Sequence, residues 1–263
     1  MPTVESLGVE LAVEVIGNGE PVTVVGHGLT QDRNVFVIPA QFIPGAKVLF
    51  DFRGHGGSGR PPPGSYSFDH FAADVRTVAD EYKATRVVGI SLGAGATLRL
   101  LESDPDRFER LVFILPARLE RSDVAHKRLL RLAEVLETYP PNEAADIIVA
   151  EEQELGAFDT IPSLRESRRD ALMKMHTDSI PFAIRELLDE PAVRKPDVIR
   201  SVRTPALVIG QEGDNVHKAE VARELAAALP NAELEILPSP SAWMDDLPRL
   251  VQRVAAFLAA DLG

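Results

Sequence analysis

The feature that most constrains the fold is a set of short apolar runs of strand length, separated along the chain by helix-forming segments. The runs are rich in β-branched residues and each is followed by turn residues: Pro21–Val25, Lys47–Phe50, Arg86–Ile90, Leu111–Leu115, Pro205–Gly210 and Glu233–Leu237. Apolar strands that alternate with helices are typical of a parallel sheet with helices on both faces. The pattern therefore predicts an α/β protein with a mostly parallel, doubly wound sheet.

The spacing of apolar side chains predicts helices in several of the gaps. Phe71, Val75 and Val78 recur at helical intervals and lie on one face of a predicted helix. Outside the middle of the chain, one helix is expected directly after Ser91, and others are expected over residues 68–82, 219–229 and 247–262. At the N-terminus, alternation of apolar and polar residues around Gly8 predicts a β-hairpin.

The middle of the chain has a different character. From residue 117 to residue 196 strand-like runs are missing, charged helix-forming segments dominate, and prolines recur, as at Pro140 and Pro141. We expect four short helices in this segment. The predicted organisation is a core of residues 1–116 and 197–263, interrupted by a helical cap of residues 117–196.

Ser91 lies where a predicted strand meets a predicted helix. The sequence reads Gly89-Ile90-Ser91-Leu92-Gly93 and continues into an alanine-rich helix. Glycines on either side permit a sharp turn and close packing of strand and helix, and they leave the hydroxyl projecting at the helix N-terminus. This arrangement suits a nucleophile, so Ser91 is the candidate nucleophile.

Three further motifs follow other predicted strands, namely Gly26-His27-Gly28, Asp51–Ser58 and the turn from Gly210 to Asp214. Together with the serine turn, and in this order, they resemble the α/β-hydrolase superfamily over nearly the whole chain outside the predicted cap. The resemblance implies an α/β-hydrolase fold with an inserted helical cap. That superfamily includes esterases, thioesterases, lactonases, haloperoxidases and non-catalytic receptors, so the fold does not define the substrate.

The resemblance also implies roles for individual residues. Ser91 matches the nucleophile, and the backbone N–H groups of Leu29 and Leu92 match the oxyanion hole. Asp214 matches the acid that orients the base, and Glu212 in the same turn is a weaker match. A serine nucleophile in place of an aspartate argues against a dehalogenase.

The sequence departs from the family at the base. The family places a histidine in the loop after the last strand, before the proline that opens the final helix. Here no histidine occurs after His217, and the expected position holds Ser241 or Ala242. Neither side chain can take a proton from Ser91, and loss of a triad member usually costs several powers of ten in turnover.

Three interpretations account for this loop. In the first, the chain is an inactivated variant in which Ala242 replaces a histidine. In the second, the base comes from elsewhere, with His217 as the best candidate, although a histidine at a helix start also has a purely structural interpretation. In the third, the protein is a natural departure that keeps the pocket as a binding protein or a non-hydrolytic enzyme.

Other residues are weaker candidates for the site. His27 and Trp243 are expected to line the substrate pocket, although the family uses His27 and His55 mainly to shape loops. His126 and His176, within the predicted cap, are further candidates to face the pocket. No pairing of histidines with carboxylates has the spacing of metal ligands, so we expect neither a metal nor another cofactor.

The amino-acid composition limits the classes of molecule that the protein is expected to bind. The 263 residues carry a net charge of -12, which argues against nucleic acid, because phosphate binding depends on Lys and Arg. The chain contains no cysteine, which excludes a thiol nucleophile. The longest apolar runs are strand-sized and the first residues do not form a signal-peptide pattern. We therefore expect a cytoplasmic protein that does not enter a membrane, with its oligomeric state left open.

The function that these features predict is a serine hydrolase. It acts on a small-molecule ester, thioester or lactone with an apolar acyl group, through an acyl-enzyme on Ser91. The alternative, motivated by the missing base, is a ligand-binding or non-hydrolytic protein that reuses the same pocket.

Overall fold

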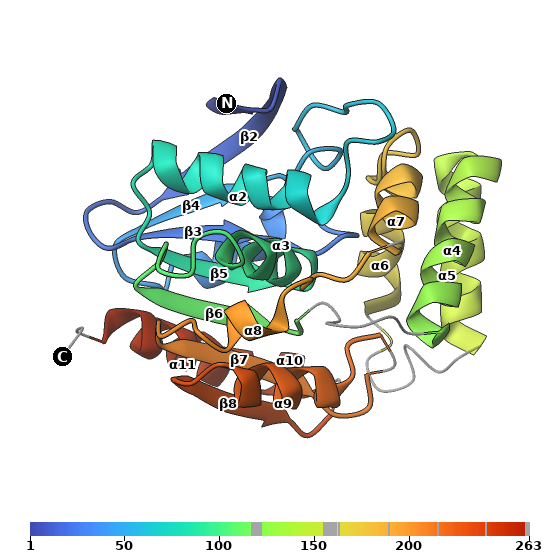
Figure 1. The fold of residues 1–263 in the computed structure, drawn as a ribbon. Helices are drawn as coiled ribbons and strands as arrows, with labels where there is room; N and C mark the ends of the chain where they lie inside the picture. Colours follow the sequence, from blue (N-terminus) through green and yellow to red (C-terminus); the bar gives the residue numbers. More distant parts are fainter. Residues whose placement is uncertain are drawn as a thin grey trace.

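The computed structural model describes residues 1–116, 123–154, 162, 164–188, 190–214, 216–239 and 241–260. Within them the chain forms a sheet of eight strands in the order β1-β2-β4-β3-β5-β6-β7-β8 (Figure 1). The strands are β1 (Thr3–Ser6), β2 (Val9–Ile16), β3 (Val22–Gly26), β4 (Ala46–Phe50), β5 (Arg86–Ile90), β6 (Arg110–Ile114), β7 (Ala206–Gln211) and β8 (Ala232–Leu237). The pairs β1–β2 and β2–β4 are antiparallel. The remaining pairs, from β4 through β3, β5, β6 and β7 to β8, are parallel. The mostly parallel sheet is thus confirmed.

The alternation of side chains along the strands builds one core on each face of the sheet. Val24 and Val87 lie in the first core, which contains side chains from α2 (Phe68–Glu81), α3 (Leu92–Leu101) and α9 (Ala219–Ala228). Their neighbours Val25 and Val88 lie in the second core, against α1 (Val37–Ala40) and α11 (Leu247–Ala259). Both faces are therefore covered, as the sequence predicts for a doubly wound sheet.

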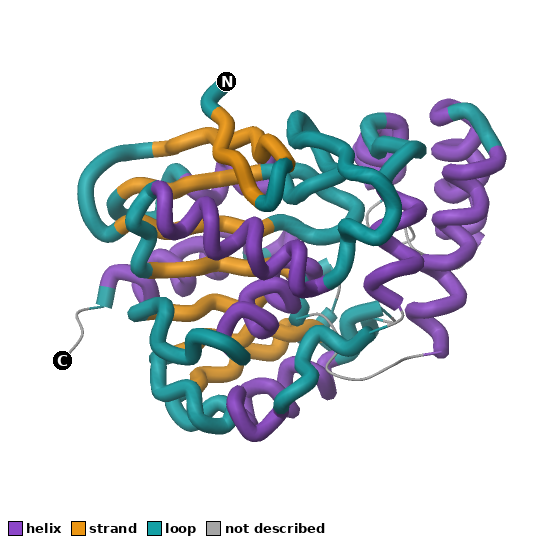
Figure 2. Tube along the Cα trace, turned by 45° about the horizontal axis from the view of Figure 1, so that its top comes forward, coloured by secondary structure: helices purple, strands orange, loops and turns teal. Residues whose placement is uncertain are grey.

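Of the five helices that the structure describes between β6 and β7, four form a separate layer. They are α4 (Asp123–Thr138), α5 (Pro141–Glu154), α6 (Leu164–Met173) and α7 (Ile180–Leu188), and the short α8 (Pro196–Ile199) follows them. Their apolar faces pack on one another, with Leu136, Ala145 and Ile184 in a third core. Figures 1 and 2 show this layer beyond one end of the strands. The helical insertion is confirmed, and its exact limits remain a prediction because residues 117–122 lie outside the described part.

Hydrogen bonds fasten the inserted layer to the loop that follows β4. Glu186 of α7 accepts hydrogen bonds from the N–H groups of Gly64 (2.6 Å) and Tyr66 (2.8 Å). The Ser179 hydroxyl donates to the carbonyl oxygen of Gly54 at 2.7 Å. These contacts hold the inserted helices against the edge of the sheet at which Ser91 lies. None of the described helices is long and apolar enough to cross a membrane.

Candidate active site

Ser91 occupies a strained turn between β5 and α3. Its φ of 49° and ψ of -104° lie in a region that residues with a side chain rarely adopt, at a cost of about 1–3 kcal/mol. The glycines of the turn are needed for space, because a Cβ on Gly93 would lie 2.3 Å from the carbonyl oxygen of Gly26. The Ser91 N–H donates to the carbonyl oxygen of Ile114 at 3.0 Å. The hydrogen bond to β6 and the close packing of α3 against β3 therefore hold the serine in this strained conformation.

His217 lies beside this serine. Its Nε2 is 2.8 Å from the Ser91 Oγ, although the two residues are 126 positions apart in the chain. His217 belongs to the loop between β7 and α9, and the side chain is 24% exposed. Because β5 and β7 are both parallel strands, their carboxyl ends meet at the same edge of the sheet. The fold thus brings the two side chains together.

Asp214 holds the other side of the imidazole. Its Oδ2 is 3.2 Å from His217 Nδ1, and its Oδ1 accepts hydrogen bonds from the N–H groups of Val216 (2.7 Å) and His217 (2.9 Å). Burial raises the pKa of Asp214, but the hydrogen bond and charge of His217, with the two backbone N–H groups, lower the pKa further, to about 2. Asp214 is therefore a carboxylate at neutral pH.

The ionised carboxylate fixes the tautomer of His217. A carboxylate only accepts hydrogen bonds, so His217 Nδ1 carries the proton and donates it to Asp214. Nε2 is then unprotonated and accepts a hydrogen bond from the Ser91 hydroxyl. In this tautomer the imidazole can take the hydroxyl proton, which is what activation of a serine requires.

The loop after β3 presents its backbone next to the serine. The carbonyl oxygen of Gly28 accepts hydrogen bonds from the Gln31 N–H at 3.1 Å and from the His27 ring at 2.8 Å. The N–H of Leu29 belongs to the same peptide unit, so these bonds fix its direction. Leu92 is the first residue of α3, where the backbone N–H has no partner within the helix.

Two buried histidines brace this loop. His27 Nε2 accepts from the Phe52 N–H at 3.0 Å, so the opposite nitrogen, Nδ1, donates to Gly28. His55 Nε2 lies 2.7 Å from the carbonyl oxygen of Leu29. Burial lowers the pKa of His27 well below its usual value, and it also lowers the pKa of His55. The expectation that His27 lines the pocket is wrong, because its side chain is 0% exposed and both nitrogens serve the backbone.

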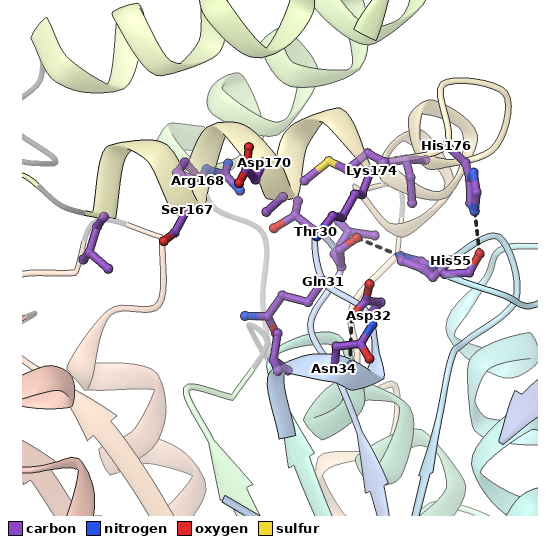
Figure 3. Close-up of a pocket in the computed structure, with 17 residues that line it drawn as sticks. Thr30, Gln31, Asp32, Asn34, His55, Ser167, Arg168, Asp170, Lys174 and His176 are labelled. Atoms are coloured by element: carbon purple, nitrogen blue, oxygen red, sulfur yellow. Dashed lines mark hydrogen bonds between the residues drawn. The ribbon is translucent and has the colours of Figure 1, made fainter. Parts of the chain in front are cut away.

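A cleft of about 880 Å³ opens between this loop and α6 (Figure 3). Thr30, Gln31, Asp32 and Asn34 line it from the loop, and Ser167, Arg168, Asp170 and Lys174 line it from α6 and the residue after it. His176 also lines the cleft, with its Nε2 2.7 Å from the carbonyl oxygen of Gly56. The inserted helices thus form one wall of a space next to the loop that carries Leu29.

The loop after β8 does not supply a base. Ala242 begins α10 (Ala242–Asp245), is 7% exposed, and packs in the second core. The Ser241 hydroxyl lies 2.9 Å from the Ser239 hydroxyl. The side chain of Trp243 lies outside the described part of the chain, so its place in the pocket stays a prediction. Glu212, the weaker candidate for the acid, forms a surface ion pair with Arg223.

Two glutamines of the site have no signal in the sequence. Gln31 accepts a hydrogen bond from the Gly28 N–H at 3.0 Å through its side chain, which closes the turn that carries Leu29. The Gln211 side chain at the end of β7 lies 3.4 Å from Asp214 Oδ2. Each glutamine reaches its partner only because of the path that its loop takes. Residue types and spacing do not specify that path.

Comparison with known proteins identifies the family. The chain matches the family described as alpha/beta hydrolase fold over residues 21–243, and it therefore belongs to that family. Among solved structures it is similar to an esterase from Exiguobacterium antarcticum, with 17% identity, a TM-score of 0.80, and coverage of 98% of this chain and 99% of the other. It is also similar to the enol-lactonase from Burkholderia xenovorans, with 23% identity, a TM-score of 0.80, and coverage of 98% and 100%.

Curated relatives match shorter stretches. A Synechocystis protein, whose name is that of a non-heme chloroperoxidase, is 30% identical over 120 residues, 42% of this chain and 42% of the relative. A Caulobacter segnis protein, whose name is that of a carbamate hydrolase, is 43% identical over 70 residues, 26% of each chain. The chain spans less than half the length of these curated relatives.

Proposed function

We propose that the protein is a serine hydrolase that cleaves a small-molecule ester, thioester or lactone through an acyl-enzyme on Ser91. The observation that carries the proposal is the chain of contacts from Ser91 Oγ to His217 Nε2 (2.8 Å) and from His217 Nδ1 to Asp214 Oδ2 (3.2 Å). Nucleophile, base and orienting acid in hydrogen-bond sequence are the signature of nucleophilic acyl transfer. Structures of an esterase and a lactonase with this fold agree with the proposal.

The steps follow from the geometry. Ser91 Oγ attacks the carbonyl carbon while its proton passes to His217 Nε2, and Asp214 stabilises the resulting imidazolium. The negative charge that develops on the carbonyl oxygen is held by the N–H groups of Leu29 and Leu92, each of which contributes about 3 kcal/mol in comparable sites. His217 then returns the proton to the departing alcohol or thiol. Water attacks the acyl-enzyme by the same route and releases the acid.

The position of His217 bears on the interpretations of the loop after β8. A base at His217 would make a histidine at position 242 unnecessary, which supports a hydrolase over a binding protein without turnover. The proposed domain arrangement assigns residues 117–196 to a cap over the site, and the cleft between α6 and the loop after β3 supports this assignment.

The test is the reactivity of Ser91 in matched variants. A fluorophosphonate probe should label the wild-type protein and fail to label Ser91→Ala. His217→Ala should lower the rate of labelling and kcat/KM for 4-nitrophenyl butyrate by at least about 10³-fold. His70→Ala is the control, because His70 lies on α2 with its ring bonded to Ser67, and its rate should stay close to wild type. Absence of labelling in wild type, or equal rates in His217→Ala, would overturn the proposal.

A further inference from the structure

An apolar cavity of about 530 Å³ lies on the sheet face that α1 and α11 cover. All of its lining residues are non-polar except Gln31 and Asn34. The walls come from α1, from α11, and from strand residues on this face, such as Val25, Val88 and Ile209. The volume is within the range of small-molecule sites in proteins.

The cavity reaches the chain segments that hold the candidate nucleophile. Ile90, which directly precedes Ser91, lines it, and so do Ile114 and Leu115 at the end of β6. Ser91 itself is hydrogen bonded through its N–H to the carbonyl oxygen of Ile114 at 3.0 Å. The apolar space therefore begins next to the backbone on which the reactive hydroxyl stands.

The cavity also adjoins the cleft of Figure 3. Gln31, Asn34 and Val35 line both spaces, so one segment of the loop after β3 separates them. Gln31 closes the turn of Gly28 and Leu29. Leu29 lines the cleft and Ile90 lines the cavity, so the two spaces flank the chain segments that carry the Leu29 N–H and Ser91.

The rim of the cavity is apolar and faces solvent. Val35 and Ile38, which line the cavity, are 42% and 70% exposed, and Phe42 on the following turn is 65% exposed. Contiguous exposed apolar side chains are unfavourable unless a ligand or partner uses them. Their position at the mouth of a non-polar cavity favours a ligand with a hydrocarbon part.

We propose that this cavity holds the hydrocarbon chain of the substrate's acyl group, so that the preferred substrates are esters or thioesters of unbranched, medium-length carboxylic acids. The proposal rests on the proposed function and adds the substrate class. Burial of the chain supplies binding energy in proportion to its length, and the polar leaving group occupies the cleft beside α6.

The first experiment fills the cavity. kcat/KM for 4-nitrophenyl acetate, butyrate, hexanoate and octanoate should rise roughly fourfold for each added methylene in the wild-type protein. Val254→Phe places a ring in the cavity from α11, and it should lower the ratio of the octanoate to the acetate value at least tenfold. If Val254→Phe does not fold, Val251→Phe, at a second residue that lines the cavity, serves as the filling variant. Ala256→Phe adds the same ring to an exposed position of α11 and should leave the ratio unchanged.

The second experiment measures binding without turnover. Decanoate should bind the wild-type protein in calorimetry, at least tenfold more tightly than it binds Val254→Phe. If Ser91 is not labelled but decanoate binds the wild-type protein more tightly than Val254→Phe, the proposed function is refuted and the cavity remains a binding site. Ester hydrolysis with an unchanged octanoate-to-acetate ratio, or decanoate binding equal in both proteins, would overturn the cavity proposal. So would a change from dimer to monomer in Ile38→Asp, because the rim would then be a contact between two copies.

Discussion

Replacement of Asp214 by asparagine tests the link between the charge at the site and the chemistry. The side chain of Asp214 is 17% exposed, and its pKa falls from 3.8 to about 2 in the folded protein. A shift of almost two units corresponds to about 2 kcal/mol of stability contributed by the carboxylate. Asparagine keeps the shape and removes the charge, so Asp214→Asn should lose about this amount at pH 7.

The sign of the pH dependence follows from the depressed pKa. Because the folded protein binds the proton on Asp214 less tightly than the unfolded chain does, the stabilisation is fully present above the unfolded pKa of 3.8. It is lost as the pH falls from about 5 through the folded value of about 2. Urea unfolding of wild type and Asp214→Asn should therefore differ most at pH 7 and converge near pH 2. A gap that does not change with pH would refute the electrostatic origin.

The same variant should lose activity through the tautomer of His217. The asparagine amide would present an N–H to His217 Nδ1, so the ring would carry its proton on Nε2 and donate to Ser91 in place of accepting from it. We expect kcat/KM to fall about 10⁴-fold with the fold intact. Glu212→Gln, in the same turn but paired with Arg223 on the surface, should change stability by less than about 0.5 kcal/mol. Turnover by Asp214→Asn within tenfold of wild type would refute the role of the acid.

Three further predictions concern the supports of the site. Gly89→Ala puts a Cβ 2.6 Å from the backbone of Gly93 and should cost more than about 3 kcal/mol in thermal unfolding, whereas Gly8→Ala, with open space around it, should cost about 1 kcal/mol. His27→Ala should lower kcat about 10- to 100-fold and leave KM within threefold, because it frees the peptide that carries the Leu29 N–H; a KM effect alone would contradict this reason. Ala242→His should give no gain in ester hydrolysis and should destabilise the buried start of α10 by about 1–3 kcal/mol; a gain would favour the interpretation that this chain is an inactivated variant.

The sequence predicts the strands and helices of the sheet domain well, because the residues that specify each element lie close together in the chain. β5 and β6 are β-branched runs that end at turn residues, and α2 follows from the spacing of Phe71, Val75 and Val78. The serine turn is predictable for a related reason. Any chain with this strand-turn-helix lacks space for a Cβ atom at these two positions. A Cβ on Gly89 would lie 2.6 Å from the backbone of Gly93, and a Cβ on Gly93 would lie 2.3 Å from the carbonyl oxygen of Gly26.

The finer features of the site are not local and are harder to predict. His27 is in a motif, yet the sequence cannot distinguish a ring that faces a ligand from one that donates to the Gly28 carbonyl oxygen. Gln31 and Gln211 carry no pattern, because a side-chain amide that closes a turn depends on the loop path. The apolar cavity depends on how far α1 and α11 stand from the sheet, which hydrophobic spacing does not encode.

The distance between acid and base along the chain explains how a base at His217 would work. Asp214 and His217 are three residues apart in one loop, and Asp214 Oδ1 accepts the N–H of His217 while its Oδ2 faces the same residue's ring. The carboxylate therefore fixes both the backbone and the imidazole of the base, so a second loop is not required to position it. With that task met in the loop after β7, the loop after β8 can bury Ala242 in the core and begin α10. Because a triad is defined by geometry and roles, the proposed triad would keep the order of nucleophile, acid and base, with the base in the loop after β7.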